Sequence, residues 1–400
     1  MQSSNRGLLA QVSAAHLVSH FYMLVIPALL PVLPEMMQVN FMQLGFALAV
    51  FGVVSALVQA PIGFLVDKWG AKSLLKGALF LGGLSYLLLA LMPSYPVLIL
   101  AMALSGLANG VYHPADYALL SKGMPRERMG RAFSIHTFSG YLGAALAPPI
   151  IIAISFTLDV RWAFAFAALL GFLVWALLQL RSFEIAPINV GLAKEGKPAV
   201  EVRPLRLPVF TLGVLTLLFM LLSLSTGSIE KFSVTALVEG FNTPLNLANQ
   251  ALTGFLFASA FGVLFGGYLA DKTTKHGFLA ALTFGLAAVL VLLVIYLPLA
   301  GFVLVGTLTL IGFLTGVVAP SRDMLVRAAA PEGSEGKVFG IVSTGFNFGA
   351  IAGPLLFGWL VDKQLATGVF WASFSFMVAT SLLVLAQEIK PAKKQFLAID

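Results

Sequence analysis

The sequence has no cysteine and few charged residues. Of its 400 residues only 10% are Asp, Glu, Lys or Arg, whereas 59% are hydrophobic and the mean hydropathy is +0.95. The absence of cysteine excludes disulfides and thiolate metal sites. The shortage of charge excludes an ordinary soluble domain, because so many apolar residues cannot fit in one buried core and must face lipid.

Several signatures of catalytic and nucleotide-binding sites are also missing. The sequence contains no His-Glu-x-x-His, no Gly-x-Ser-x-Gly and no phosphate-binding Gly-x-x-x-x-Gly-Lys-Ser/Thr. We therefore expect neither an enzyme nor an ATP-driven pump, and no cofactor. The alternatives to a transporter are a membrane-embedded enzyme and a passive channel. The alternating pattern of a membrane β-barrel is absent as well, which leaves an all-α integral membrane protein.

Twelve apolar segments are long enough to cross the bilayer, since one crossing takes about 20 apolar residues in a helix. Several of them contain proline or glycine, so we expect tilted and locally broken helices. The segments are 10–33, 43–66, 73–92, 97–121, 131–157, 161–181, 207–230, 248–270, 277–299, 301–327, 337–361 and 366–387.

Positive charge gathers on one side of this predicted arrangement. The net charge of +7 is therefore a topology signal and not a sign of nucleic-acid binding. If the N-terminus is cytoplasmic, the loops on the opposite side of the membrane contain only three basic residues, which are Arg161, Lys231 and Lys363. Both termini are then cytoplasmic, in a plasma membrane of bacterial type, and no cleavable signal peptide is expected. The cytoplasmic set is Lys68, Lys72, Lys76, Lys122, Arg126, Arg128, Arg131, Arg181, Lys272, Lys275, Lys337, Lys390, Lys393 and Lys394.

The chain contains one stretch twice. Residues 110–149 match the residues 206 positions later without a gap, so that Gly110 falls on Gly316 and Pro114 on Pro320. A second echo, between residues 63–68 and 267–272, has an offset of 204. Two echoes at nearly one spacing indicate duplicated halves, and six spans in each half require a parallel repeat. We predict bundles over 1–181 and 207–387, a cytoplasmic linker over 182–206 and a cytoplasmic tail over 388–400.

Polar residues at membrane depth mark the candidate pathway for substrate and protons. His16 and His20 lie one turn apart on one helix, and Asn109, His113 and Asp116 line one stripe of another. Each ionisable group at this depth costs roughly 2.5–3.5 kcal/mol on insertion scales, so it needs a cavity or a partner. No metal is predicted, because His16 and His20 are two ligands without a third. The other members of the set are His136, Arg322, Asp323 and Asn347.

Arg322 occupies the position in the second repeat that Asp116 occupies in the first. Under the pseudo-twofold axis, the two side chains point toward the same axis from opposite halves. We hypothesise that they meet, directly or through His113, when the cytoplasmic side closes. The alternative is that Arg322 pairs locally with Asp323 or with the backbone.

A charged turn after the second segment resembles the loop between helices two and three of the major facilitator superfamily, and the likeness covers essentially the whole chain. Its glycines permit close helix contact, and its carboxylate suits a helix terminus. The resemblance implies a rocker-switch transporter with alternating access. In such a transporter this motif and its echo would form a conformational latch between the halves. The alternative is a charged turn that only fixes the orientation of the helices in the membrane. The latch residues are Gly63, Asp67, Lys68, Gly70, Lys72, Gly267, Asp271 and Lys272.

Within that superfamily the sequence is similar to the fosmidomycin-resistance group of exporters. The similarity lies in Ser13-x-x-His16, in residues 27–31 and 41–45, and in Tyr112-His113-Pro114. Two features of the group are missing: His20 replaces an acidic residue, and the arginine of helix four is absent from 102–110. A further motif resembles helix five of the family's antiporters, where glycines permit tight crossing and prolines bend the helix; its alternative is ordinary membrane packing. That motif comprises Gly140, Gly143, Pro148 and Pro149.

These observations favour proton-coupled export of small anionic or amphiphilic organic compounds, with a monomeric protein in the lipid bilayer. The export direction and the substrate class follow from the resemblance to the exporter group. Arg322 and several titratable histidines independently favour an anion and proton exchange near neutral pH. Asp116 is the best candidate for the coupling carboxylate. Proton-coupled uptake of an organic acid is the alternative.

Overall fold

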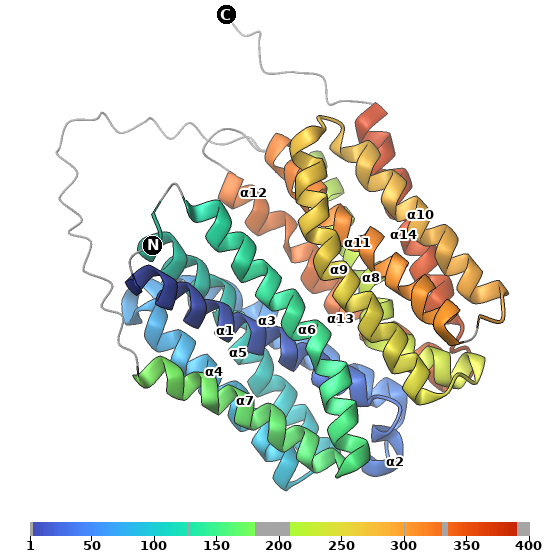
Figure 1. The fold of residues 1–400 in the computed structure, drawn as a ribbon, viewed down its shortest axis with the longest axis horizontal. Helices are drawn as coiled ribbons and strands as arrows, with labels where there is room; N and C mark the ends of the chain where they lie inside the picture. Colours follow the sequence, from blue (N-terminus) through green and yellow to red (C-terminus); the bar gives the residue numbers. More distant parts are fainter. Residues whose placement is uncertain (1–2, 126–127, 181–208, 300, 330–334, 390–400) are drawn as a thin grey trace, which may run out of the picture.

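The computed structural model describes residues 3–125, 128–180, 209–299, 301–329 and 335–389. In this part of the chain every regular element is a helix (Figure 1). The first seven are α1 (Ser3–Leu29), α2 (Leu33–Met37), α3 (Phe41–Trp69), α4 (Ala71–Leu91), α5 (Tyr95–Gly123), α6 (Met129–Thr157) and α7 (Val160–Leu180). The others are α8 (Val209–Phe241), α9 (Leu245–Lys272), α10 (His276–Tyr296), α11 (Gly301–Ala329), α12 (Glu335–Val342), α13 (Thr344–Asp362) and α14 (Gly368–Ile389).

Local sequence sets the helix boundaries. Asn40 begins α3 with a capping box, in which its side chain accepts from the backbone N–H of Gln43 and the Gln43 side chain accepts from the backbone N–H of Asn40. Gly70 has φ of +84°, a conformation that favours glycine, and it separates α3 from α4. Long uninterrupted helices satisfy their own backbone hydrogen bonds, as a chain in lipid must.

The helices form two groups that lie side by side in Figure 1. In the first half α1 packs against α5, α6 and α7, while α4 packs against α5 and α7 and α3 packs against α5. In the second half α8 packs against α13 and α14, α9 against α11, and α10 against α11 and α14. The halves meet mainly where α3 packs on α13 and α6 on α9, with a smaller contact between α1 and α8.

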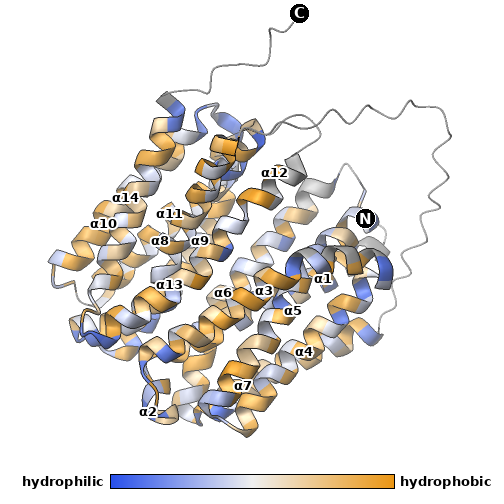
Figure 2. Ribbon diagram, turned by 180° about the vertical axis from the view of Figure 1, so that it is seen from behind, coloured by the Kyte–Doolittle hydropathy of each residue, from blue (hydrophilic) through white to orange (hydrophobic). Residues whose placement is uncertain are grey.

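Twelve helical segments in the described part of the chain are long and apolar enough to cross a membrane. Figure 2 shows hydrophobic residues along the helices, with hydrophilic residues gathered toward the helix ends and connections. The predicted all-α fold with twelve membrane spans is confirmed. The predicted linker over 182–206 lies outside the described residues, as does the tail beyond residue 389.

Three boundaries differ from the prediction. Helix α1 ends at Leu29, before the predicted end of the first span at residue 33, and the short helix α2 follows with Pro34 in its first turn. The predicted span over 337–361 is divided into α12 and α13 at Ser343, where side-chain hydroxyls of Ser343 and Thr344 donate to the carbonyls of Gly340 and Ile341.

The third difference changes the position of a charged pair. Helix α8 runs to Phe241, so Glu230 and Lys231 lie within the span, ten or more residues before its end. The expectation that Lys231 belongs to an outer connection is therefore wrong. The first half covers Lys231, since the pocket that Lys231 lines is otherwise formed by residues of α1, α3, α4 and α5.

Candidate functional site

Asp116 lies at the centre of a polar cluster inside the first half. It projects from α5, and its side chain is completely buried. Its Oδ2 is 3.5 Å from Nδ1 of His16 on α1 and 3.7 Å from Nε2 of His136 on α6. Among the residues whose side chains are described, Asp116 makes no ion pair with a lysine or an arginine. Three helices thus bring two imidazoles to one carboxylate.

The four histidines of the first half form one continuous group of rings, which we call the histidine cluster: His16, His20, His113 and His136. The rings of His16 and His136 are stacked, with centroids 3.8 Å apart. The His16 ring is also 4.6 Å from that of His20 and 5.3 Å from that of His113. His16 is the middle residue of α1, so the cluster lies at membrane depth. The structure therefore brings together His16, His20, His113, Asp116 and His136, five of the residues that were predicted to lie on the pathway for substrate and protons.

The cluster contains polar atoms without hydrogen-bond partners among the described residues. These atoms include both carboxylate oxygens of Asp116, Nδ1 of His16 and both ring nitrogens of His136. The contacts at 3.5 Å and 3.7 Å are too long to be good hydrogen bonds. Because a buried polar atom without a partner costs about 1–3 kcal/mol, this arrangement favours binding of a proton or a cation between the rings.

Gly140 makes room for the cluster. A Cβ at this position would lie 2.6 Å from Nε2 of His16 and 3.0 Å from Cδ2 of His20. One turn further along α6, a Cβ at Gly143 would lie 2.1 Å from the backbone carbonyl oxygen of Leu17. The two glycines of the predicted helix-bending motif thus allow α6 to cross α1 closely, and Pro148 and Pro149 follow inside the same helix.

Arg322 pairs locally in this structure. Its Nη2 is 2.7 Å from Oδ1 of Asp323, and its guanidinium lies 5.0 Å from the ring centroids of both Phe219 and Phe346. This is the alternative that the sequence analysis left open. The hypothesis that Arg322 meets Asp116 concerns closure of the cytoplasmic side, and it stays a prediction. The half-buried Asn347 follows Phe346 on α13.

Tyr117 connects the cluster with Arg322. Its ring centroid is 5.9 Å from that of His113 and 6.1 Å from that of His136. The same side chain lies within electrostatic range of Arg322 and Asp323 on α11. Tyr117 therefore borders the cluster and is near enough to the charged pair of the second half for the charges to interact. By contrast, Asn109 is directed to α3, where its amide donates to Oγ of Ser55 at 2.8 Å.

The sequence analysis missed Glu230 and Lys231 as candidate site residues. Lys231 lines a small pocket whose other walls, formed by Tyr22, Met23, Ile26, Leu48, Phe51, Tyr86 and Met102, all belong to the first half. Glu230 lies within electrostatic range of Tyr141 on α6. The available signal was a charged dipeptide with long apolar sequence on both sides, which the early predicted end of the seventh span concealed.

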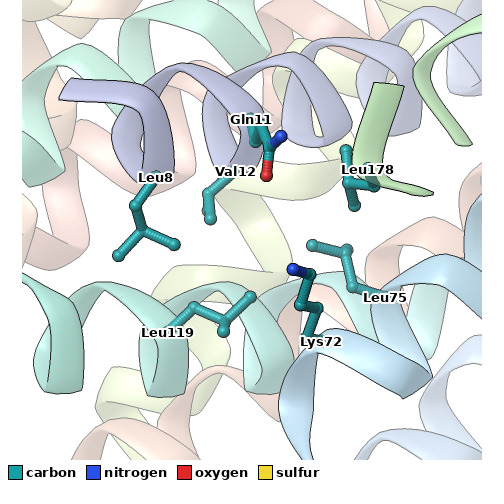
Figure 3. Close-up of a pocket in the computed structure, with 7 residues that line it drawn as sticks. All are labelled: Leu8, Gln11, Val12, Lys72, Leu75, Leu119 and Leu178. Atoms are coloured by element: carbon teal, nitrogen blue, oxygen red, sulfur yellow. The ribbon is translucent and has the colours of Figure 1, made fainter. Parts of the chain in front are cut away.

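For the residues of the predicted latch, the contacts that the structure gives lie within one half. Lys72 faces a pocket within the first half, between α1, α4, α5 and α7 (Figure 3). Asp271 and Lys272 are exposed, and Lys272 contacts the ring of Tyr268 on its own helix. A Cβ added at Gly267 would meet no atom of a neighbouring element within 4 Å. The side chain of Asp67 and the surroundings of Gly63 lie outside the described part of the structure. The predicted latch, which also includes Lys68 and Gly70, therefore stays a prediction.

Among the described residues, one set of side chains could hold a metal ion. Nitrogen or oxygen donors of His16, Asp116 and His136 all lie within 4.8 Å of one another. The sequence analysis considered His16 with His20 and found no third ligand, whereas the fold supplies the other two donors from α5 and α6.

Solved transporter structures share this fold. A bacterial homologue of the human lysosomal transporter Spinster, in an inward-facing unoccupied conformation, superposes with a TM-score of 0.75, covering 97% of this chain and 96% of that chain at 13% identity. The nucleoside transporter NupG gives a TM-score of 0.72 and 14% identity, covering 95% of this chain and 99% of that chain.

Sequence comparisons give the family. The fosmidomycin resistance protein of Escherichia coli (strain K12) is 31% identical over 354 residues, 86% of this chain and 83% of the relative. The quinolone resistance protein NorA of Staphylococcus aureus (strain MSSA476) is 25% identical over 379 residues, 92% of this chain and 93% of that protein. The family profile of the Major Facilitator Superfamily matches residues 13–242 and 220–399. The chain therefore belongs to the Major Facilitator Superfamily of membrane transporters.

Proposed function

We propose that this transporter exports small anionic or amphiphilic organic compounds in exchange for protons. The observation that carries the proposal is Asp116, a fully buried carboxylate that contacts two imidazoles and has no ion pair with a described lysine or arginine. Intramembrane carboxylates and histidines typically form proton relays in transporters. Asp116 would hold the coupling proton, with His16, His20 and His113 as its alternates and His136 as a contact.

Proton binding at Asp116 has a route by which it can influence the second half. Tyr117 follows Asp116 on α5 and lies within electrostatic range of Arg322 and Asp323. A change in the charge of the cluster would shift the partners available to Arg322 across the interface. This link suits a rocker-switch cycle in which the two halves move against each other, with α3–α13 and α6–α9 as the moving contacts.

Two cationic side chains of the second half support an anionic cargo. Arg322 is partly accessible beside Phe219 and Phe346, and Lys231 lines a pocket of aromatic and aliphatic side chains. The cavity beside Lys231 has room for about one water molecule, so a cargo would reach this cation only after the halves separate. A cation beside apolar side chains would then suit both the charge and the apolar part of an organic anion. Export rather than uptake is supported by the two relatives whose names record resistance to fosmidomycin and to quinolones.

Orientation and assembly are part of the same proposal. We infer that both termini face the cytoplasm of a bacterial plasma membrane, since Lys68, Lys76, Lys122 and Lys272 lie at the helix ends of that side. The protein would act as a monomer whose partners are its cargo, protons and lipid, without nucleic acid. The latch residues would hold the cytoplasmic ends of the two halves together when the cytoplasmic side is closed.

The proposal is tested in inside-out membrane vesicles of an Escherichia coli strain that lacks its own fosmidomycin resistance protein. A thermal-shift screen of anionic metabolites and antibiotics, fosmidomycin included, selects the cargo. Respiration acidifies the vesicle interior, and a pH-sensitive dye reports the gradient. Added cargo should release protons from the interior and restore the dye fluorescence in vesicles that hold the protein.

Control vesicles that hold the Asp116→Asn variant should show no cargo-dependent release. Vesicles with His276→Ala should behave as wild type, because His276 lies outside the cluster at the start of α10. A response only in right-side-out vesicles would instead establish proton-coupled uptake. Cargo accumulation without any dye response would refute proton coupling.

A further inference from the structure

We propose that His16, Asp116 and His136 bind a divalent transition-metal ion such as Zn²⁺. The site would have two imidazole nitrogens and one carboxylate oxygen as ligands, and a fourth ligand would complete the tetrahedral geometry that Zn²⁺ prefers. This inference depends on the geometry of the cluster and requires neither a particular cargo nor a transport direction.

The donor spacing is close to that of a zinc site. Ligands at about 2.0–2.1 Å from a tetrahedral zinc ion are about 3.3–3.4 Å apart. Oδ2 of Asp116 is 3.5 Å from Nδ1 of His16 and 3.7 Å from Nε2 of His136. The three donors come from three different helices and all lie within 4.8 Å of one another. The rings of His16 and His136 are stacked, so binding would require them to turn until both ring nitrogens point at the ion.

Burial and the missing partners point to a bound cation. His16 is 4% exposed, Asp116 0% and His136 1%. Nδ1 of His16, both nitrogens of His136 and both oxygens of Asp116 have no hydrogen-bond partner among the described residues. A divalent ion would coordinate three of these atoms at once and would balance the buried carboxylate charge.

The donor types select the ion. Imidazole nitrogens favour Zn²⁺, Co²⁺ and Ni²⁺, whereas Ca²⁺ and Mg²⁺ prefer oxygen ligands. The rings of His20 and His113 lie 4.6 Å and 5.3 Å from that of His16, so these two histidines are the nearest further source of a nitrogen ligand among the described rings. A metal ion in this place would exclude a proton from Asp116 and connect α1, α5 and α6, so it would inhibit proton-coupled transport.

The experiment is a Co²⁺ titration of the full-length purified protein, prepared without a polyhistidine tag. Tetrahedral Co²⁺ with nitrogen ligands gives visible absorption bands that free Co²⁺ lacks. We expect one equivalent of Co²⁺ to saturate these bands and Zn²⁺ to abolish them. His16→Ala, Asp116→Asn and His136→Ala should each weaken binding at least tenfold. His276→Ala is the matched control, since His276 is the one histidine outside the cluster.

Thermal unfolding gives a second readout that separates loss of the site from loss of the fold. Zn²⁺ should raise the unfolding midpoint of wild type and His276→Ala, but not that of the three ligand variants, provided that each variant still unfolds cooperatively. A ligand variant that does not fold is replaced by His16→Gln or His136→Gln. The proposal is wrong if wild type gives no tetrahedral bands, or if the bands persist in the ligand variants. Because no transport is measured, failure here is distinct from failure of the proposed export.

Discussion

Asp362, at the end of α13 in the second half, caps the start of α3 in the first half: its Oδ1 accepts a hydrogen bond from the backbone N–H of Phe41 at 2.8 Å. Its Oδ2 accepts from the backbone N–H of Met42 at 2.7 Å. The first N–H groups of a helix have no partner within the helix, and the helix dipole favours a negative charge beside them. A side chain of one half therefore satisfies the backbone of the other, at the end of the molecule away from both termini.

This contact predicts that Asp362→Asn favours separation of the halves at that end. The loss of the charge weakens two hydrogen bonds by about 1–2 kcal/mol in total, enough to shift a conformational equilibrium roughly tenfold. The chain has no cysteine, so spin labels can be placed on Met92→Cys and Leu297→Cys without other changes. The distribution of distances between the labels should move to longer values.

Asp159→Asn is the control for that measurement. Asp159 accepts from the backbone N–H of Arg161 at 2.7 Å, within one half. This variant should leave the distances between the labels unchanged. Equal distributions in Asp362→Asn and wild type would show that the contact does not hold the halves together.

Gly140→Ala should damage the histidine cluster. The new methyl would lie 2.6 Å from His16, so the imidazole must leave its position, and overpacking of this kind typically costs 1–3 kcal/mol. We expect a lower unfolding midpoint and at least a tenfold loss of proton-coupled transport.

Gly77→Ala provides the comparison for this substitution. Gly77 lies on α4 in the same half, with no atom within 4 Å of an added Cβ. Alanine there should maintain or slightly raise the unfolding midpoint, since glycine inside a helix is less favourable by roughly 0.5–1 kcal/mol. If both variants behave alike, the close contact between α6 and α1 has no special importance.

Lys231→Gln should weaken binding of an anionic cargo about tenfold, because a hydrogen bond to a charged group contributes about 1.5–3 kcal/mol. Lys231→Arg should retain most of the affinity, and a neutral amphiphile should bind both variants equally. Titration calorimetry with the cargo measures these affinities. Lys363→Gln, at the exposed end of α13, is the control. Unchanged anion affinity in Lys231→Gln would exclude this residue from the cargo site.

The membrane spans could be predicted from the sequence because the bilayer imposes a length of apolar helix that few other structures need. The position of a charged residue within a span was harder to predict from the sequence. A charged dipeptide such as Glu230-Lys231 usually lies at the end of a span, and only the packing of the opposite half shows that it lies inside one.

The cluster could be predicted as a set of residues but not as a geometry. His136 and Gly140 lie one turn apart. From the sequence alone, the histidine was predicted to be a polar pathway residue and the glycine to be part of a helix-packing motif. Their common role depends on how closely α6 crosses α1. The internal repeat predicts Asp116 as the partner of Arg322. In this conformation Arg322 pairs instead with Asp323, the next residue in the chain.

The most direct test of the account compares two transport modes in proteoliposomes that contain the Asp116→Asn variant. Exchange of labelled for unlabelled cargo moves no net proton, whereas accumulation against a gradient requires one. If Asp116 carries the coupling proton, the variant should retain exchange and lose accumulation driven by a pH gradient at every pH between about 5 and 8. Gradient-driven accumulation equal to that of wild type, with the same dependence on pH, would contradict the account.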